Sequence, residues 1–369
     1  MQKFIVELAK ESDDLSLKRI LCTTPMEGDI KVAFQREPSY FCALETAGKF
    51  NQTIVARDTK TNDVVGMGTR SIKPAYVNGE ITPIGYLNSL RIDKRYRNRT
   101  LLNRGYTYFR QLHQDKRTQI YLSTIIQDNE KVRQLLTSKR VRLPLYHDIG
   151  ECRTFAIKLV RKKRGFSKRI AVSKGTNNDL GGIVECLNRN GKEKQFYPYY
   201  TKADFRSDKR YLKDFKIEDF YVARVQGKIV GVIGKWDQSG FKQTLISGYS
   251  RKIKLIRPVY NHVAKIFKYP QLPEPGKHLT FFYVSFIAID DNDPNIFAAL
   301  VRALYNDSVD SKYSYMMIGL FQKDPLLSVI KQYASIEYKS RIYVVCWDDG
   351  EHVFKTLDGR IPYLEISTL

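Results

Sequence analysis

An internal repeat constrains the fold more than any other feature of this sequence. Residues 55–68 recur as residues 222–234, and each copy has two apolar runs joined by a short polar turn. Residues 120–129 match residues 315–324, each an apolar run that ends in a Gln and an acidic residue. Apolar runs of this length predict strands, and the apolar spacing that follows the second pair predicts helices. Two matches in the same order indicate that one domain containing both helices and strands has been duplicated, with a period too long for a solenoid.

Length and composition agree with two globular domains. The chain has 369 residues, of which 43% are hydrophobic, so each half has enough apolar residues for its own core. It has no run of about eighteen apolar residues and no apolar leader after Met1, so we expect no membrane partner. Five widely spaced cysteines in apolar surroundings are typical of reduced thiols in a cytoplasmic protein. The five histidines lack metal-ligand spacing, and we expect no metal site.

The positive charge is concentrated near the middle of the chain. The formal net charge is +23, and residues 161–175 contain seven Lys and Arg without any acidic residue. The Gly- and Asn-containing stretch that follows predicts a loop. We therefore predict a first domain at 1–160, a linker at 161–182 and a second domain at 183–369. Such a run is more often a solvated linker, although binding to nucleic acid or to an anionic surface stays open.

Residues 87–106 predict a strand, an arginine-rich loop and a helix that begins near Thr100. From Arg91 to Arg104 there are six basic residues and a single acidic one, Asp93. The first turn of a helix presents unpaired backbone N–H groups and the positive end of the helix dipole. A basic loop that leads into such a turn is suited to a phosphate or pyrophosphate group.

This segment resembles the coenzyme A site of the GCN5-related N-acetyltransferases, in which an Arg/Gln-x-x-Gly-x-Gly/Ala loop follows a strand and holds the pyrophosphate. Arg97 matches the first position of that motif, and Thr100 and Leu102 occupy the two small-residue positions. The order of the predicted elements is also similar to that fold. The resemblance implies an α+β fold with two tandem acetyltransferase-like domains, each a mostly antiparallel sheet flanked by helices.

The same resemblance implies an activity and a set of site residues. The activity is direct transfer of acetyl from acetyl-CoA to an amine of a small molecule or peptide. The implied cofactor-binding residues are Leu90, Arg91, Ile92, Arg97, Asn98, Arg99, Thr100, Leu101, Leu102 and Asn129. In that family a Tyr at this position usually acts as the general acid, whereas this chain has Leu136 there. Candidate catalytic residues on the acceptor side are Tyr86, Asn88, Tyr146 and His147, for each of which a structural hydrogen bond is the alternative role.

The two halves differ at the loop that would hold the pyrophosphate. In the second half, residues 290–294 contain three Asp and no Arg or Gly, which would repel an anion. We therefore expect only the first domain to bind coenzyme A. An insertion at 255–277 precedes this part of the second domain, and helical spacing over 256–267 makes it either a cover for a site or a surface decoration.

Three functions remain open from the sequence. The first is an acyl-CoA-dependent N-acyltransferase with an active first domain. The second is a protein of the same fold that binds a ligand without catalysis. The third is a transferase that uses an aminoacyl-tRNA donor, which the positive charge would favour because phosphate contacts dominate binding to tRNA.

Overall fold

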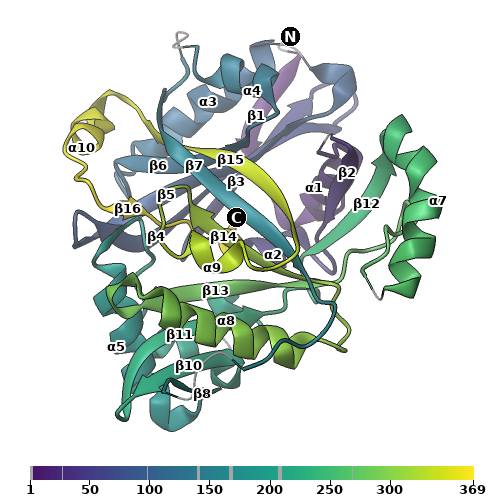
Figure 1. Ribbon diagram of the computed structural model, residues 1–369. Coiled ribbons are helices and arrows are strands. Elements are labelled where there is room, and N and C mark those ends of the chain that lie inside the picture. Colours follow the sequence, from purple (N-terminus) through teal and green to yellow (C-terminus); the bar gives the residue numbers. More distant parts are fainter. Residues whose placement is uncertain are drawn as a thin grey trace.

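The computed structural model describes residues 3–26, 28–97, 99–138, 142–165, 169–206, 210–267 and 269–369. One twelve-stranded, mostly antiparallel sheet runs through the molecule, and helices cover its faces (Figure 1). The mixed α+β class predicted from the sequence is confirmed.

Both halves of the chain contribute strands and helices to this arrangement. The first half contains β1 (Phe4–Leu8), α1 (Asp14–Thr23), β2 (Ile30–Gln35), α2 (Tyr40–Leu44), β3 (Phe50–Asp58), β4 (Val64–Val77), β5 (Glu80–Ile92), α3 (Arg99–His113), β6 (Ile120–Ile126), α4 (Glu130–Leu136) and β7 (Leu145–Lys158). The second half contains β8 (Ala171–Lys174), α5 (Leu180–Gly191), β9 (Lys194–Gln195), α6 (Lys202–Arg206), β10 (Phe220–Val225), β11 (Lys228–Trp236), β12 (Gln243–Tyr249), α7 (Arg251–Ile266), β13 (Phe281–Ile289), α8 (Pro294–Ser308), β14 (Tyr315–Phe321), α9 (Leu327–Ile330), β15 (Ser335–Cys346), α10 (Glu351–Lys355) and β16 (Ile361–Pro362).

The repeated sequence segments form the same structure in both halves. The first pair forms the antiparallel hairpins β3–β4 and β10–β11. In each half the next strand, β5 or β13, pairs with the hairpin, and a helix then leads to a parallel neighbour, β6 or β14. The structure thus contains the duplication that the sequence predicts.

The closing strands are exchanged between the two copies. The strand order across the sheet is β1-β3-β4-β5-β6-β15-β7-β14-β13-β11-β10-β8. β15, from the second half, pairs with β6 of the first half, and β7, from the first half, pairs with β14 of the second. β7 and β15 also pair with each other, at the centre of the sheet. The two copies therefore share one continuous sheet.

A β-bulge interrupts the same strand in both copies. Opposite β4, Met67 pairs with Arg91 and Thr69 with Asn88, so Ser89 and Leu90 together oppose one residue. Ser89 has φ of +53°, and Phe286, at the matching bulge of β13, has φ of +57°. A bulge leaves backbone groups unpaired by the neighbouring strand and bends the strand. The bulge therefore presents backbone to one side of each copy at an equivalent place.

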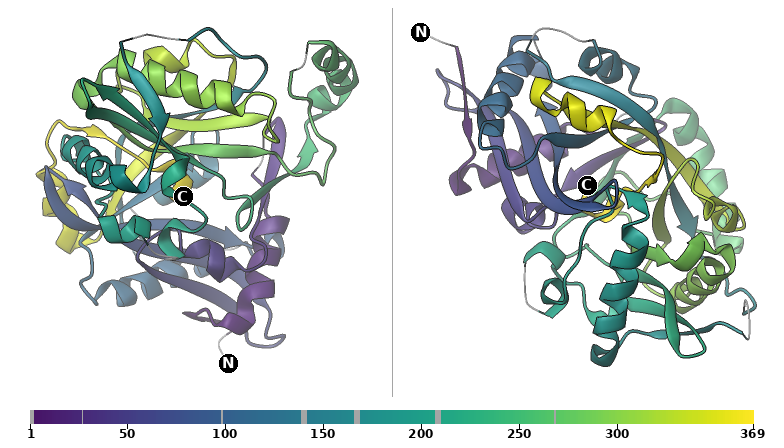
Figure 2. Two further views of the ribbon diagram at one scale, coloured as in Figure 1. Left: turned by 90° about the horizontal axis from the view of Figure 1, so that it is seen from below. Right: turned by 90° about the vertical axis from the view of Figure 1, so that its left-hand side faces the viewer.

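Alternation along the strands distributes the core over both faces of the first copy. Ile54 packs with α3 side chains, whereas its neighbour Val55 packs with Leu17 and Ile20 of α1. Successive side chains of a strand point to opposite faces, which explains why α1 and α3 cover different sides of the same strands. Figure 2 shows the helices on either side of the sheet. The largest core cluster consists mainly of residues from the second half, together with Tyr76, Phe155, Ile157 and Leu159 from the first.

The predicted insertion forms an arm that stands away from the body. β12 pairs with β2 of the first half in a separate two-stranded sheet, and α7 follows it. In Figure 2, left, this helix is set apart from the remaining helices. The predicted helix within the insertion is therefore present, although it begins at Arg251 and not at residue 256.

Candidate functional site

The bulge of β5 is accessible in the first copy. All five residues from Asn88 to Ile92 are half-buried. Beyond two residue pairs, Gly85 with Tyr121 and Tyr86 with Leu122, the parallel strands β5 and β6 no longer pair. The bulge therefore lies where the strands separate, and its residues are partly exposed to solvent.

The equivalent bulge in the second copy is closed by the chain itself. The matching residues, 285–289, are each at most 2% exposed. The backbone N–H of Phe286 donates to Glu365 Oε2 at 2.8 Å, and that of Ile287 donates to Tyr363 Oη at 3.3 Å. Ile366 packs against Gly319 on the neighbouring strand β14. Segment 363–367 therefore occupies, in the second copy, the position that is open in the first.

A basic loop follows the open bulge. Asp93 accepts the backbone N–H of Arg95 at 3.0 Å and pairs with its guanidinium at 2.8 Å, which fixes a short 3₁₀ turn before α3. Hydrogen bonds from Arg95 lower the pKa of the Asp93 carboxyl to about 2. Arg97 is exposed, and its Nε donates to the carbonyl of Ile92 at 3.4 Å. Asp93, the single acidic residue of this loop, is thus paired with Arg95 of the same loop.

Two arginines of this region repel each other. Burial, and then the charge of Arg97, lower the pKa of the Arg91 guanidinium. The Nε atom of Arg91 and the Nδ2 atom of Asn88 are buried without a hydrogen-bond partner. Buried polar donors of a native protein are usually paired, so both groups are candidates for contact with a bound acceptor. An anionic acceptor would in addition relieve the repulsion between the arginines.

The helix that follows begins where the sequence predicts. α3 starts at Arg99, and Leu101 and Leu102 are 3% and 6% exposed, with side chains in two different core clusters. Thr100 is exposed. The leucine that replaces a small residue of the acetyltransferase motif therefore turns its side chain away from the helix end. Asn98 and the side chain of Arg99 lie outside the described residues.

The residues expected near β6 and α4 are placed as follows. Asn129 is exposed at the start of α4, where its side chain makes no capping hydrogen bond. Leu136, at the position of the family's Tyr, is 4% exposed and packs in the core beneath α3. It therefore has a structural role, and the described part of this helix supplies no hydroxyl there.

The structure places three of the four predicted catalytic residues on two different faces of the sheet. Tyr146 lies on the face of α3, and its Oη is 2.6 Å from that of Tyr106. Tyr86 and His147 lie on the other face, where Tyr86 Oη is 2.7 Å from Thr124 Oγ1 and His147 stacks on Phe354 at 3.9 Å. Asn88 adjoins the bulge and accepts a hydrogen bond from Ser89 Oγ at 2.8 Å. Burial raises the pKa of Tyr146 to about 12, so its hydroxyl stays protonated at neutral pH.

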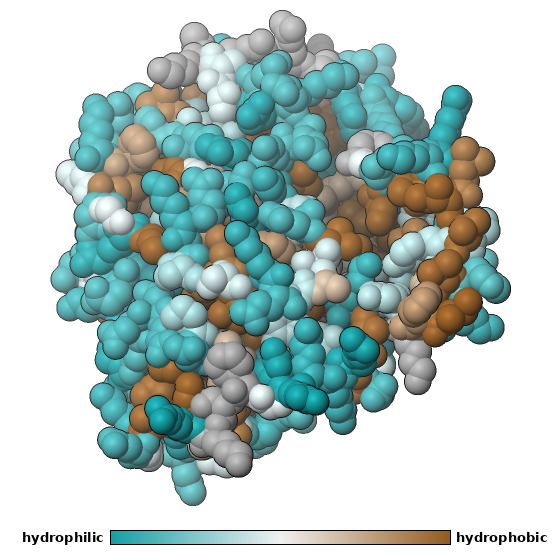
Figure 3. All heavy atoms as spheres, in the orientation of Figure 1, coloured by the Kyte–Doolittle hydropathy of each residue, from teal (hydrophilic) through white to brown (hydrophobic). Residues whose placement is uncertain are grey.

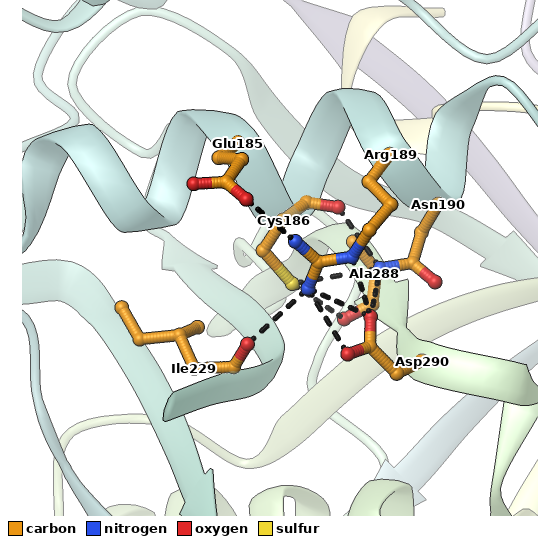
Figure 4. Close-up of polar contacts among 7 residues, drawn as sticks. All are labelled: Glu185, Cys186, Arg189, Asn190, Ile229, Ala288 and Asp290. Atoms are coloured by element: carbon orange, nitrogen blue, oxygen red, sulfur yellow. Dashed lines mark hydrogen bonds and ion pairs between the residues drawn. The ribbon is translucent and has the colours of Figure 1, made fainter. Parts of the chain in front are cut away.

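A polar contact is duplicated along with the fold. In the second copy, Arg189 of α5 donates to both oxygens of Asp290, at 2.9 and 3.0 Å, and to the carbonyl of Ile229 at 3.2 Å (Figure 4). In the first copy, Arg19 of α1 lies 3.8 Å from Asp93 and donates to the carbonyl of Val64 at 2.9 Å. Each arginine ties the first helix of its copy to the carboxylate that follows the bulged strand.

Sequence reasoning missed two parts of this region. The first is the closing segment, since Tyr363 and Glu365 stand in a short stretch with no recognisable pattern. The second is a pair of half-buried lysines beside that segment. Lys242 Nζ donates to the Ser367 carbonyl at 3.0 Å, and Lys73 Nζ donates to Thr368 Oγ1 at 2.7 Å. Burial lowers the pKa of Lys73 to about 8, and burial also lowers that of Lys242 well below its usual value.

The remaining sequence-based expectations concern cysteines, metals and membranes. All five cysteines are free, and Cys152, Cys186 and Cys346 are buried. Within the described ranges, no cluster of three or more His, Cys, Asp or Glu could hold a metal ion. None of the helices in the described part of the chain is long and apolar enough to cross a membrane.

Comparison with solved structures identifies the fold. At 13% identity the likeness concerns the fold alone, and the chain shares its fold with N-myristoyltransferase. Two of the similar structures are of N-myristoyltransferase from Saccharomyces cerevisiae. One, with bound myristoyl-CoA, has a TM-score of 0.58 and 13% identity and covers 94% of this chain and 79% of that one. The other, with myristoyl-CoA and inhibitors, has a TM-score of 0.60 and 13% identity, covering 94% of this chain and 80% of that one.

A third similar structure is a GCN5-related N-acetyltransferase from Kribbella flavida. It has a TM-score of 0.49 and 10% identity, and the alignment covers 93% of this chain and 71% of that one. No protein-family model and no curated protein matches the sequence.

Proposed function

We propose that the protein is an N-acyltransferase that uses an acyl-CoA donor and that the first copy carries the active site. The observation that carries this proposal is the contrast between the two bulges. Residues 88–92 are half-buried and accessible, whereas residues 285–289 are covered by segment 363–367. Within the described residues, the bulge of the first copy is therefore the more exposed of the two and the one not covered by segment 363–367.

The arrangement suits the chemistry of acyl transfer. When an amine attacks a thioester carbonyl, the C–N bond forms, negative charge develops on the carbonyl oxygen, and the thiolate then leaves. Backbone N–H groups at the bulge of Ser89 and Leu90 would stabilise that charge, as oxyanion holes do in other acyl transfers. Asn88 adjoins them and is the predicted catalytic residue best placed to contact the substrate. The other three, Tyr86, Tyr146 and His147, stay candidates for the acceptor side.

The basic loop would hold the other end of the donor. Arg91 and Arg97 both precede α3, and their mutual repulsion would be relieved by the pyrophosphate of coenzyme A. The core orientation of Leu102 explains how the site tolerates a leucine in place of a small residue. Asn129, exposed beyond β6, would face the pantetheine arm.

The proposal also covers the length of the acyl chain on the donor and the kind of acceptor. The motif in the sequence leads us to propose acetyl-CoA as the donor and a small-molecule or peptide amine as the acceptor. The yeast N-myristoyltransferase structures hold myristoyl-CoA, which makes a long chain the alternative donor. A panel of acetyl-, octanoyl- and myristoyl-CoA with peptide and polyamine acceptors distinguishes them through release of free thiol.

Titration calorimetry with acetyl-CoA, myristoyl-CoA and free CoA tests the binding step. We expect one site per chain, and we expect Arg97→Glu to weaken it at least about tenfold, because the change sets a negative charge against the pyrophosphate. Lys228→Glu makes the same change of charge at an exposed residue, the first of β11 in the second copy, and serves as the control. An equal effect of both variants, or none of either, would remove the loop from the site.

The other two functions make different predictions in the same experiments. A binding protein without catalysis would take up acyl-CoA but release no thiol with any acceptor. A tRNA-dependent transferase would bind tRNA in a salt-sensitive manner and would use no acyl-CoA.

A further inference from the structure

Helix α7 presents an unusually apolar face to solvent. Leu255 is 80% exposed, Val259 69%, Ile266 64% and Phe267 62%. Ile256 and Val263 add to the same face at 48% and 45%. Side chains at these spacings share one side of a helix. In Figure 3 they form a brown stripe along α7 on a surface that is otherwise mainly hydrophilic. We call these six residues the α7 apolar face.

The charge around this face has a single sign. Residues 251–267 contain five Lys and Arg and no acidic residue. Four of these cations, Arg251, Lys252, Lys254 and Lys265, are exposed. An amphipathic helix with an apolar side and basic flanks is the type that lies in the interface of an anionic bilayer. Two copies of this helix packed face to face would bring like charges together, which disfavours self-association through it.

A cationic cavity lies next to α7. It has a volume of about 680 Å³ and is lined by ten residues, of which six are basic and none is acidic: Lys158, Arg161, Lys162, Lys163, Arg164 and Arg302. Tyr269, just beyond α7, lines it as well. Lys158 connects the two features, since its Nζ is 3.5 Å from Tyr260 Oη on α7 and 5.3 Å from the centre of the Tyr269 ring. The basic run that the sequence predicted as a linker thus forms a wall of this cavity.

The cavity is held in shape by contacts with the second copy. The backbone N–H of Lys163 donates to Asn306 Oδ1 at 2.8 Å, and Arg302 Nε donates to Tyr333 Oη at 3.1 Å. Among the described residues, none of the six cations pairs with a carboxylate. A cluster of unpaired cations around a concavity attracts a polyanionic group, with phosphate as the usual one in proteins.

We propose that the protein binds peripherally to anionic phospholipid bilayers, with the α7 apolar face in the interface and lipid phosphate groups in the cationic cavity. The α7 apolar face and the cationic cavity are adjacent. Together they complement the apolar interior and the phosphate groups of a single bilayer surface. A nucleic acid would use the cations and leave six exposed apolar side chains without a partner. The sequence has no run of about eighteen apolar residues, and for that reason we expected no membrane partner. A helix that lies on the membrane surface does not need such a run.

Vesicle flotation with the full chain tests the proposal. We expect binding to phosphatidylcholine vesicles that contain phosphatidylserine, and much weaker binding to phosphatidylcholine alone. The double variant Leu255→Ser and Val259→Ser should lower the bound fraction at least about tenfold, because it removes apolar surface from the interface. Leu15→Ser and Ile81→Ser, at positions 75% and 51% exposed elsewhere, form the matched control and should bind as the wild type does.

Charge reversal provides the second arm of the experiment. Arg161→Glu with Lys162→Glu should reduce binding to anionic vesicles and leave binding to neutral vesicles unchanged. Binding that depends on these cations but not on the α7 apolar face, and that tRNA displaces, would overturn the proposal in favour of a nucleic acid. Equal binding to neutral and anionic vesicles, or none to either at low salt, would also overturn it. Neither variant touches the bulge, so thiol release in solution separates this result from that of the proposed activity.

Discussion

The segment that closes the second copy gives the sharpest test of the architecture. Glu365 is 3% exposed and accepts three hydrogen bonds, from the Phe286 N–H at 2.8 Å, Tyr363 Oη at 2.8 Å and Ser367 Oγ at 2.7 Å. Glu365→Ala removes the acceptor of all three donors, each of which belongs to a buried residue. At about 1–3 kcal/mol for each unsatisfied group, we expect a loss of about 3 kcal/mol or more in the free energy of unfolding. Glu365→Gln keeps one oxygen and loses only the charge assistance, so about 2 kcal/mol is expected.

Urea unfolding followed by circular dichroism measures this difference. Glu80→Gln, which changes the same charge at an exposed position, is the control and should be within about 0.5 kcal/mol of the wild type. The order of stability should be wild type, then Gln, then Ala. The reasoning would be refuted if the Ala variant lost less than about 1 kcal/mol, the lower bound for even one unsatisfied buried donor. It would also fail if the Ala variant were as stable as the Gln variant.

Three further predictions follow from packing, titration and topology. A Cβ at Gly85 would lie 2.1 Å from Tyr121 Cδ1, so Gly85→Ala should cost about 2 kcal/mol or more in urea unfolding, whereas Gly165→Ala, with nothing within 4 Å, should be neutral. Because burial lowers the pKa of Lys73 to about 8, the unfolded state binds more protons above that pH, so stability should rise from about pH 8 to 10.5. Lys73→Met should remove the part of that rise that Lys73 contributes and add up to about 3 kcal/mol at neutral pH. A chain of residues 1–160 lacks both neighbours of β7 and should aggregate, and a soluble, cooperatively folded monomer would contradict the strand exchange.

Local patterns explain why much of the fold could be predicted. The hairpins β3–β4 and β10–β11 each consist of two apolar runs around a short turn, and their pairing needs no information from elsewhere in the chain. The start of α3 near Thr100 likewise follows from the change of apolar period after the basic loop. The predicted position of Arg97 at that loop depends on the same local features.

The sequence could not predict on which face of the sheet each candidate catalytic residue would lie. Tyr146 and His147 are neighbours in the chain, and adjacent residues of a strand point to opposite faces. Only the packing of Tyr146 against Tyr106 and of His147 against Phe354 assigns each to its side. The sequence of β7 does not indicate which of its faces meets which helix.

The sequence by itself determined that the chain is a duplicated α+β domain and that one loop of the first copy is basic where its counterpart is acidic, because both depend on residue type and spacing. The tertiary structure alone decided that β7 and β15 exchange places and that Tyr363 and Glu365 close the second bulge. These contacts join residues far apart in the chain, and backbone hydrogen bonding is the same for every residue type. The identity of a strand's partner is therefore set by how the whole chain buries its apolar faces, which no local pattern records.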